Sequence, residues 1–347
     1  MSLEAYIDIR FADPVISLSI NQRGLCYGSA LGRVLYYNFN THEETPITEF
    51  SEECIRGVSL SADGSLFIAI GDLYCWAVLN PDSLQSSREV INHERLHSND
   101  DCGYTQVLMK DDTVCILTIT QLAGIADRAD TIYITNISSQ IKLKFEIPSL
   151  PPQSVPYDFD GKRLLWMEWG TNLLRTFKMY DFTTQAVSEI AAYEKKYGHI
   201  THVKLLQDSI LLVRNHRSLI LVDISTGVTR HILGTHKADI VALNWLCLKE
   251  GIASMASDDD NITATKLVII AVDYDGNICL WDNQGLAECI QIKNLPQLTP
   301  PYQKLMYFSM GYPYIVAAHD VKIAFSSDLG VLVVRSKYLE SLQNLQT

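Results

Sequence analysis

One stretch of the sequence, NHERLHSND at residues 92–100, contains the residue types that hold and use zinc in hydrolases. His93 and His97 are four residues apart, so on an α-helix their imidazoles would share one face and could ligate one ion. Glu94 would then act as general base on the metal-bound water. This chemistry requires a helical segment and a third ligand from elsewhere in the fold.

The surroundings of this stretch favour a loop. Apolar residues do not recur at helical spacing around it, and HSNDDCG, residues 97–103, is typical of a loop. Arg95 places a charge inside the motif, and no downstream helix offers a third ligand. We therefore interpret His93, Glu94 and His97 as a coincidental match, and we predict no metal and no cofactor.

The remaining sequence carries little other chemistry. The motifs G-x-S-x-G, G-x-x-x-x-G-K-[ST] and G-x-G-x-x-G are absent, so we predict that the protein is not an enzyme. The acidic run SDDDN, residues 257–261, lacks the spaced ligands and the glycine of an EF-hand. It lies in a polar stretch at residues 249–266, which we interpret as a solvated insertion and as the first candidate for a binding element.

Composition narrows the class of protein further. With 47% hydrophobic and 20% charged residues, the 347-residue chain can bury a large core. Its net charge of −12 argues against broad electrostatic binding to nucleic acid or anionic lipid. The eight cysteines occur singly without C-x-x-C, and the start MSLEAYIDIRFAD has no apolar core of a signal peptide. These features predict reduced thiols and a cytoplasmic protein, with the nucleus as a second compartment.

The elements that position these residues are short strands. Apolar or alternating runs of four to eight residues are separated by turn residues, as in PVISLSI followed by NQRG. The runs recur in groups, and the third run of a group ends in an aromatic or aliphatic residue followed by Asp or Asn. These endings are Tyr37-Asn38, Tyr180-Asp181, Val222-Asp223 and Trp281-Asp282, with a weaker case at residues 134–136.

A repeat of roughly 40–50 residues with four strands is typical of a β-propeller. Groups begin near residues 14, 54, 103, 155, 199, 239 and 302, which predicts an all-β, seven-bladed propeller forming one domain over residues 1–347. A strand at residues 3–11 would complete the last blade and remove free sheet edges, and residues 338–347 would form a short C-terminal tail. A sandwich or two stacked barrels is the competing fold.

One group resembles a WD repeat, through LGTHKADIVALNW at residues 233–245 and VDYDGNICLWD at residues 272–282. The resemblance implies a buried hydrogen-bond chain of His236, Asp275 and Trp281 that also includes a hydroxyl residue. The sequence departs from the family in two places, because Thr235 interrupts the family's Gly-His pair and Asp273 stands where the hydroxyl residue is expected. Members of this family present rigid surfaces to other proteins, so the resemblance implies a scaffold.

A second resemblance leaves an alternative open. Residues 15–38 are similar to the opening blade of the PROPPIN family of phosphoinositide-binding propellers, and residues 226–240 resemble the region of its paired arginines. Ile232 and Leu233 occupy those two positions here, so the bidentate donors to lipid phosphate are missing. A weak basic cluster remains, formed by Arg230, His236 and Lys237, with His231 beside them.

Two functions therefore follow from the sequence. The first is a non-catalytic scaffold or adaptor, a subunit of a larger cytoplasmic assembly, whose partners are other proteins and not nucleic acid. The second is a PROPPIN-like propeller in membrane trafficking or autophagy, active or deficient in lipid binding. Only the second predicts contact with a membrane.

Overall fold

The structure is a computed structural model of the chain, and it is described as two compact units. Unit 1 contains residues 1–15 and 233–347, and unit 2 contains residues 16–232. In the described part of the chain, no helix has the length and hydropathy needed to span a lipid bilayer. The described residues are 2–3, 7–10, 13–49, 55, 57–60, 66–70, 75–79, 88–91, 103–110, 113–120, 131–136, 141–146, 155–169, 175–192, 200–206, 209–249, 265–282, 284–292, 316–327 and 330–344.

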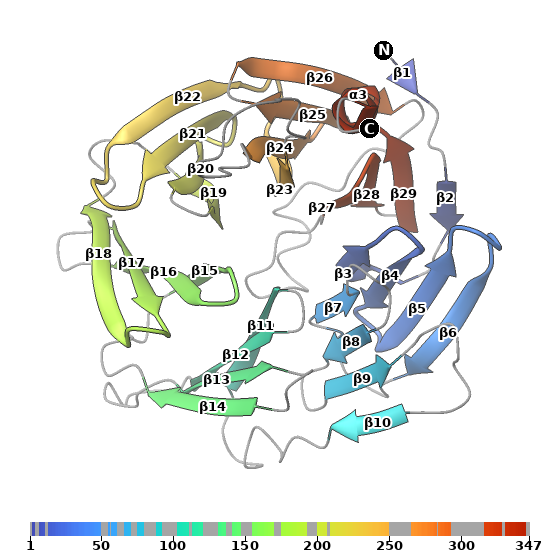
Figure 1. Cartoon of the computed structure of the whole chain (residues 1–347), viewed down its shortest axis with the longest axis horizontal. Helices are drawn as coiled ribbons and strands as arrows, with labels where there is room; N and C mark the ends of the chain where they lie inside the picture. The colour runs from blue at the N-terminus through green and yellow to red at the C-terminus, as the bar shows by residue number, and fades with distance from the viewer. Residues whose placement is uncertain are drawn as a thin grey trace, which may run out of the picture. The chain divides into compact units, whose positions relative to one another are not determined.

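Unit 2 contains five four-stranded sheets among the described residues, each built from strands that follow one another in the chain (Figure 1). The first comprises β3 (Val15–Ile20), β4 (Gly24–Ser29), β5 (Arg33–Asn38) and β6 (Glu44–Glu49). The second comprises β7 (Gly57–Leu60), β8 (Leu66–Ile70), β9 (Cys75–Leu79) and β10 (Arg88–Ile91). The third comprises β11 (Gly103–Lys110), β12 (Thr113–Thr120), β13 (Thr131–Asn136) and β14 (Ile141–Glu146). The fourth comprises β15 (Val155–Phe159), β16 (Arg163–Trp169), β17 (Arg175–Asp181) and β18 (Ala186–Ala192). The fifth comprises β19 (Ile200–Leu205), β20 (Ser209–Arg214), β21 (Ser218–Asp223) and β22 (Thr229–Thr235), the last three residues of which belong to unit 1.

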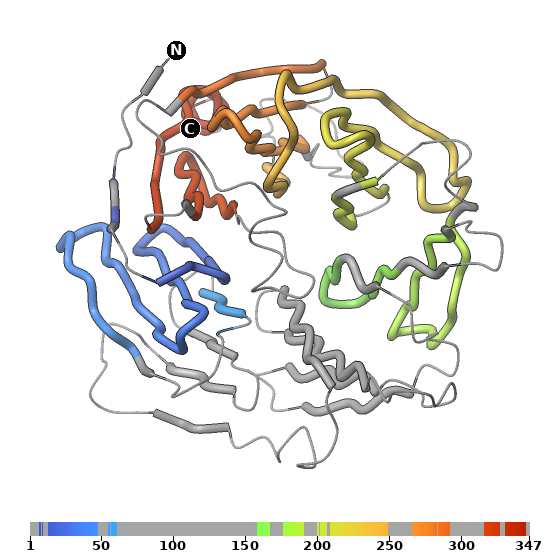
Figure 2. Tube along the Cα trace, turned by 180° about the vertical axis from the view of Figure 1, so that it is seen from behind, coloured from blue at the N-terminus to red at the C-terminus, as the bar shows by residue number. Residues whose placement is uncertain are grey.

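Unit 1 contains two described sheets, each with a strand from the start of the chain at its edge. The first sheet comprises β23 (Ile240–Lys249), β24 (Thr265–Asp273), β25 (Asn277–Asp282) and β26 (Gly285–Ile292), with β1 (Ser2–Leu3) added parallel to β26. The second comprises β27 (Val316–His319), β28 (Lys322–Ser327) and β29 (Gly330–Arg335), with β2 (Ile7–Arg10) antiparallel to β29. Figure 2 shows β2 beside the C-terminal strands from the opposite side.

The all-β class predicted from the sequence is confirmed, and the predicted groups coincide with sheets. Six of the seven groups begin at the first strand of a sheet or just before it. The seventh was placed near residue 302, whereas the first described strand of its sheet, β27, begins at Val316; residues 293–315 lie outside the described part. The number of blades, the closure of a ring and the single domain stay predictions.

The recurring Asp or Asn endings have a local cause. They fall at the ends of the third strands β5, β17, β21 and β25. Each side-chain oxygen then accepts backbone N–H groups of the following turn: Asn38 from Asn40 at 2.8 Å, Asp181 from Thr183 at 2.7 Å, Asp223 from Thr226 at 2.8 Å and Asp282 from Gln284 at 2.8 Å. Such short polar side chains favour turns because they satisfy amides that would otherwise lack a partner. The repeat in the sequence is therefore a repeat of turn chemistry.

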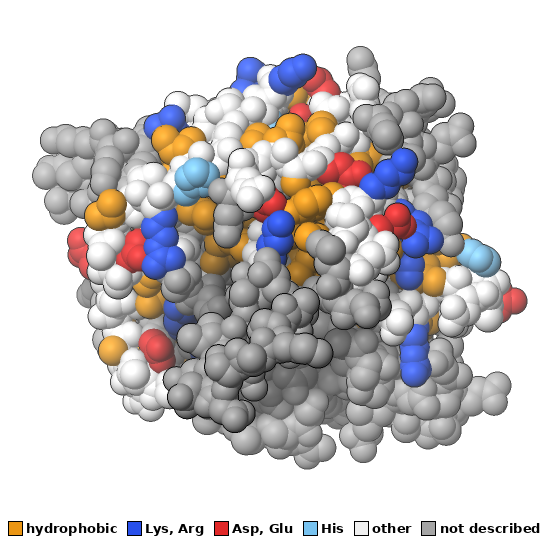
Figure 3. Space-filling model, turned by 45° about the horizontal axis from the view of Figure 1, so that its top comes forward, with side chains coloured by type: hydrophobic (Ala, Val, Ile, Leu, Met, Phe, Trp, Pro, Cys, Tyr) orange, Lys and Arg blue, Asp and Glu red, His pale blue; other side chains and the backbone are white. Residues whose placement is uncertain are grey.

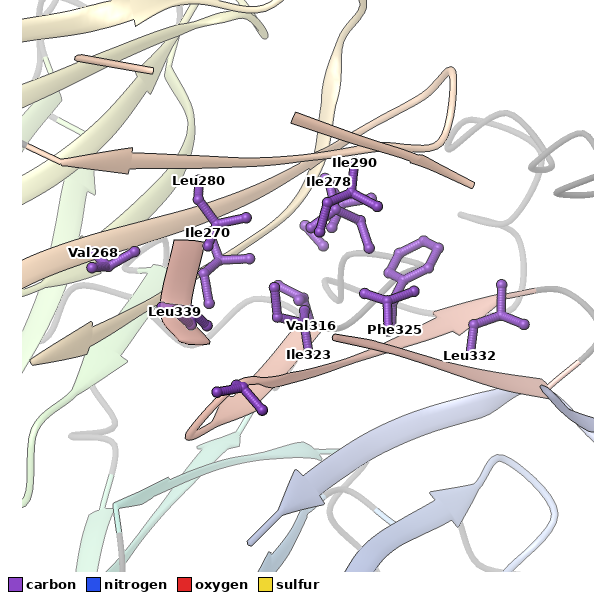
Figure 4. Packing of buried hydrophobic residues seen from close by; sticks show 14 of the residues in the cluster. Val268, Ile270, Ile278, Leu280, Ile290, Val316, Ile323, Phe325, Leu332 and Leu339 are labelled. Carbon is purple, nitrogen blue, oxygen red and sulfur yellow. The ribbon is translucent and has the colours of Figure 1, made fainter. Parts of the chain in front are cut away.

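The two sheets of unit 1 share one hydrophobic core (Figure 4). Ile270 and Leu280 come from the first sheet, Ile323 and Phe325 come from the second, and all four are fully buried. Alternate residues of a strand point to opposite faces, so the apolar positions of β25 face this core while Cys279 and Trp281 face away from it. Burial of each such side chain stabilises the fold by about 1.5–3 kcal/mol.

The C-terminal residues form a packed helix instead of the predicted tail. Helix α3 (Lys337–Asn344) begins after Ser336, whose hydroxyl accepts the amide of Leu339 at 3.0 Å as an N-cap. Leu339 is fully buried in the core of unit 1, with Tyr338 and Leu342 packed against it. The spacing of these three residues places them on one helical face. Eight residues are too few to show this periodicity clearly in the sequence.

Candidate functional site

The polar site predicted from the WD-repeat resemblance is built on the turn between β24 and β25. Asp273 ends β24, and its carboxylate accepts the backbone amides of Asp275 at 3.1 Å and Asn277 at 2.9 Å. The Asn277 side-chain amide donates to both carboxylate oxygens, at 3.0 and 3.1 Å. Gly276 closes the turn with a φ of 79°, in the left-handed region that glycine adopts without strain. The turn thereby holds one carboxylate inside the protein.

His236 connects this carboxylate to Trp281. Its Nδ1 lies 3.4 Å from Asp273 Oδ2, and its Nε2 accepts the indole N–H of Trp281 at 3.0 Å. Because Nε2 is an acceptor, the imidazole is neutral with its proton on Nδ1, which donates to the carboxylate. The side chains of His236 and Asp273 are only 1% and 2% exposed. Their polar atoms therefore depend on groups of the protein, and not on water, for hydrogen bonds.

Gly234 explains how the indole fits. A Cβ at this position would lie 2.1 Å from the Trp281 ring, which is closer than two carbon atoms can approach. The main chain at Gly234 therefore packs directly on the indole, and only glycine leaves the space. Gly234, two residues before His236, is therefore required for the close approach of the main chain to the indole.

The observed chain of hydrogen bonds differs from the predicted one in two of its members. The carboxylate beside His236 belongs to Asp273, so the assignment of Asp275 is corrected: Asp275 is exposed at the tip of the turn, and only its backbone amide takes part. The expected hydroxyl residue does not lie between tryptophan and histidine, because the indole bonds to the imidazole directly. His236 and Trp281 are brought together in space from positions 45 residues apart.

The pKa of Asp273 is set by its burial and by its hydrogen bonds within the protein. Burial, the largest influence, raises its pKa, but hydrogen bonds from His236 and Asn277 outweigh burial and hold the pKa below its ordinary value. It therefore stays ionised near neutral pH. The buried imidazole and carboxylate hydrogen-bond to each other and to groups of the turn, so they orient one another and fix the turn.

The basic cluster of the lipid-binding alternative is only partly available to a ligand. Arg230 donates from Nε to Asp223 Oδ2 at 2.7 Å and from Nη1 to Ser209 Oγ at 3.1 Å. The Ser225 hydroxyl, the Thr226 amide and Arg230 together hold the pKa of Asp223 well below its usual range, so this pairing persists at neutral pH. His236 is buried in the chain described above, and Lys237 is exposed.

The wider surface shows the same dispersal of positive charge. On the face in Figure 3, Lys and Arg side chains of the described residues are distributed over several places, and some have an acidic side chain beside them. Lys266 pairs with Asp282 at 3.2 Å and Arg335 with Glu340 at 2.9 Å. Lipid phosphate needs several converging donors, so these contacts weigh against the phosphoinositide alternative, which stays a prediction.

Exposed apolar side chains lie at the start of the outer strand of the fifth sheet. Val228, directly before β22, is 54% exposed, Ile232 on β22 is 56% exposed, and Arg230 lies between them in the sequence. These three residues are called the β22 strip below. In the described part of the chain, β22 is the last strand of its sheet, so one of its edges has no neighbour within that sheet.

Two predicted features lie outside the described residues. His93, Glu94 and His97 belong to residues 92–102, and most of the polar insertion belongs to residues 250–264. The ends of the insertion are placed: Lys249 on β23 is the register partner of Thr265 on β24, so the insertion departs from the end of a paired hairpin. Within the described part, no three His, Cys, Asp or Glu side chains are grouped as a metal site.

One pair of reactive side chains is not apparent from the sequence. Cys279 on β25 and Cys289 on β26 are register partners, with their sulfur atoms 2.8 Å apart. A β-bulge between Leu280 and Trp281 sets this register, because without the extra residue Cys279 would face Glu288. The only signal in the sequence was two cysteines on either side of one tight turn, and that signal points to the wrong partner.

Comparison with known proteins identifies the fold. No model of a known protein family matches the chain, and no curated protein matches it. Among solved structures, the WD40 β-propeller domain of Doa1 is similar with a TM-score of 0.59 at 12% identity, covering 97% of this chain and 96% of that one. The computationally designed protein Ika8 gives 0.57 at 11% identity, covering 94% and 98%. A chain in the mitotic checkpoint complex gives 0.56 at 10% identity, covering 96% and 90%. At these identities the likeness is one of fold alone, and it shows that the chain has the fold of the WD40-like β-propellers.

Proposed function

We propose that the protein is a non-catalytic interaction scaffold that holds other proteins in an assembly. The observation that carries the proposal is the WD40-like fold along nearly the whole chain, with coverage of 94% or more in the three structures above. One of those similar chains is found in the mitotic checkpoint complex, an assembly of several proteins. Fold alone does not assign a function, so the surface of this chain must supply the site.

The β22 strip is the described surface that best suits a protein partner. It combines two exposed aliphatic side chains with an arginine that is held in place by Asp223 and Ser209. An apolar contact flanking an oriented arginine is typical of interface centres, where burial of the aliphatic groups supplies affinity and the guanidinium supplies direction. The strip also lies at a sheet edge, where main-chain groups can pair with an added strand.

The experiment is quantitative affinity purification of the tagged full chain from the cells that express it. We expect a small set of proteins recovered in near-stoichiometric amounts with the wild-type chain. The double substitution Val228→Asp and Ile232→Asp should lower that recovery by about ten-fold, since two exposed apolar contacts of roughly 0.7 kcal/mol each are lost. Binding constants measured with the purified partner then check the effect directly.

A matched control separates the strip from general surface change. Leu31 is 63% exposed in the turn between β4 and β5, so Leu31→Asp introduces the same kind of charge, one per substituted residue, at a similarly exposed aliphatic position and is compared with each single Asp variant of the strip. Recovery with this variant should equal that of the wild type. Recovery that falls equally in both variants would remove the β22 strip from the proposal, and the absence of any stoichiometric protein would contradict the scaffold itself.

We also propose the cytoplasm as the place of this function, with the nucleus as the second compartment. The lipid alternative has its own measurement: flotation of the purified chain with phosphoinositide vesicles, compared with vesicles of phosphatidylcholine alone. Because Arg230 is paired and His236 is buried, we expect equal and low recovery with both vesicles. Selective recovery with phosphoinositide would favour the PROPPIN-like function.

A further inference from the structure

Cys279 and Cys289 lie opposite one another on neighbouring antiparallel strands. Their register pairing is direct, and their sulfur atoms are 2.8 Å apart, which is closer than an ordinary contact between two sulfur atoms. Residues paired directly across antiparallel strands have Cα separations of about 4.5–5.5 Å, within the range spanned by disulfides. The backbone therefore already has the geometry in which these two thiols can be joined.

The two thiols differ in access to solvent. Cys279 on β25 is buried, at 5% exposed, whereas Cys289 on β26 is exposed. A small oxidant in solution therefore reaches Cys289 more readily than Cys279. The pair thus has one thiol that can be attacked from outside and one that can react only with its neighbour.

The electrostatic surroundings also distinguish the two. The hydrogen bond from the Cys279 thiol lowers the pKa of Cys289 to about 7, and the positive charge of Lys237 acts in the same direction. That bond and burial together raise the pKa of Cys279. Because the thiolate is the reacting species, Cys289 is the nucleophile near neutral pH, and Cys279 is the proton donor that stabilises it.

We propose that Cys279 and Cys289 are a reversible disulfide site, in which peroxide oxidises Cys289 first and Cys279 then closes the bond. The oxidant is hydrogen peroxide, and the reductant is a small thiol or dithiol. This modification is independent of the scaffold function proposed above.

The chemistry balances in two steps. The Cys289 thiolate attacks one peroxide oxygen, the O–O bond breaks, and the leaving hydroxide takes a proton to give water and a sulfenic acid on Cys289. The Cys279 sulfur then attacks the sulfenic sulfur, the S–O bond breaks, and the hydroxyl leaves with the thiol proton as a second water. Two electrons pass from the two sulfurs to the peroxide, and two thiol equivalents return them on reduction.

The bond would join β25 to β26 beside the polar site. Asn277, Cys279 and Trp281 alternate along one face of β25, and the two flanking residues contact Asp273 and His236. Oxidation would therefore fix the strand that holds the buried hydrogen-bond chain. The consequence is a local increase in protection of the β25–β26 hairpin.

The test uses the reduced full-length protein, treated with hydrogen peroxide, then alkylated and digested with trypsin. The sequence has no Lys or Arg between residues 267 and 292, so both cysteines fall in one peptide that ends at Lys293. We expect this peptide to become lighter by the mass of two hydrogen atoms and to resist alkylation. Cleavage after Glu288 should then give two fragments that separate only after reduction with dithiothreitol.

Cys247 is the internal control, because it is an exposed cysteine on β23 whose register partner is Leu267. Its peptide should show no loss of two hydrogens under the same treatment. The rate of disulfide formation should rise about ten-fold from pH 6 to pH 8, as the thiolate fraction of Cys289 increases through a pKa of about 7.

Single substitutions assign the order of the two steps. In Cys279→Ser, Cys289 should stop at the sulfenic acid and react with dimedone; in Cys289→Ser, Cys279 should remain a thiol. The digest of the wild-type protein tests disulfide formation without any variant. Poor folding of a variant therefore does not affect that result. Three outcomes would overturn the proposal. Cys289 could accumulate as sulfinic acid in the wild type, or either residue could pair with another cysteine. In the third outcome, both thiols could still be alkylated after Cys247 is oxidised.

Discussion

At the scale of single residues, the buried chain of Asp273, His236 and Trp281 decides the local structure. It joins a strand end, a loop and a third strand through two hydrogen bonds and one packed ring. All three side chains are buried, so removing one partner leaves the others without a substitute from water. The same argument makes Gly234 sensitive to any added carbon atom.

We expect Trp281→Phe to lower the free energy of unfolding by about 1–3 kcal/mol. The phenyl ring retains much of the packing, but the Nε2 of His236 loses its only described donor and becomes an unpaired buried acceptor. Chemical denaturation of wild type and variant measures the difference. Tyr274→Phe, at a half-buried position of the same turn, serves as the comparison, and an equal loss there would refute the role given to the indole N–H.

Asp273→Asn tests the ionised carboxylate through pH. The folded pKa of Asp273 is below its unfolded value, so its contribution to stability is full above the unfolded pKa of roughly 4 and is lost as pH falls through the folded pKa. The difference in unfolding free energy between wild type and variant should be constant near neutral pH and should shrink below about pH 4. A difference that does not change with pH would show that the carboxylate carries no ionic role.

At the scale of elements, helix α3 is attached to the sheet by carboxylates. Glu288 on β26 accepts the amides of Lys337 at 3.3 Å and Tyr338 at 3.1 Å, and it also accepts the Ser336 hydroxyl. The Tyr338 hydroxyl donates to Asp282. A carboxylate at a helix N-terminus satisfies free amides and complements the positive end of the dipole.

We expect Glu288→Ala to release the first turn of α3, at a cost of about 1–2 kcal/mol for the lost cap. Amide hydrogen exchange at residues 337–340 should become faster, while exchange in β24 and β25 stays unchanged. Glu340→Ala is the control within the helix, because Glu340 makes a partly exposed ion pair with Arg335, which contributes little. Equal acceleration in both variants would contradict a specific cap by Glu288.

At the scale of the whole molecule, the start of the chain contributes strands to two sheets built from its end. Ser2 and Leu3 pair with Gln291 and Ile292, and β2 pairs along its length with β29. Ile7 and Ile9 on β2 are 9% and 7% exposed, so these few residues add core as well as hydrogen bonds. Unpaired sheet edges also favour aggregation, which an added strand prevents.

We expect deletion of residues 2–10 to lower the stability by about 3–6 kcal/mol, at roughly 1.5–3 kcal/mol for each lost isoleucine. The melting temperature should fall and light scattering should rise on heating, because two sheet edges become free. The double substitution Ile7→Ser and Ile9→Ser keeps the backbone and should reproduce the loss of stability with less scattering. A deletion variant with unchanged melting would show that β1 and β2 contribute nothing to unit 1.

Local patterns in the sequence predict the strands, most of their groups of four and the turns between them. These features depend on interactions within a few residues: alternation that suits a two-faced sheet, and Asp or Asn side chains such as Asn38 and Asp181 that accept the amides next to them. The WD-repeat resemblance also rests on short local segments, and it indicates that His236 and Trp281 take part in one chain of hydrogen bonds.

Which side chains meet depends on the register and packing of the strands. One bulge opposite Trp281 moves the register of β26 by a residue, and that shift places Cys289 rather than Glu288 opposite Cys279. Likewise, packing of His236 against the end of β24 selects Asp273 over Asp275, and burial of Leu339 turns a polar C-terminus into α3. For the cysteine pair and for His236, a displacement of one or two residues changes the partner, whereas α3 depends on the core in which Leu339 is buried.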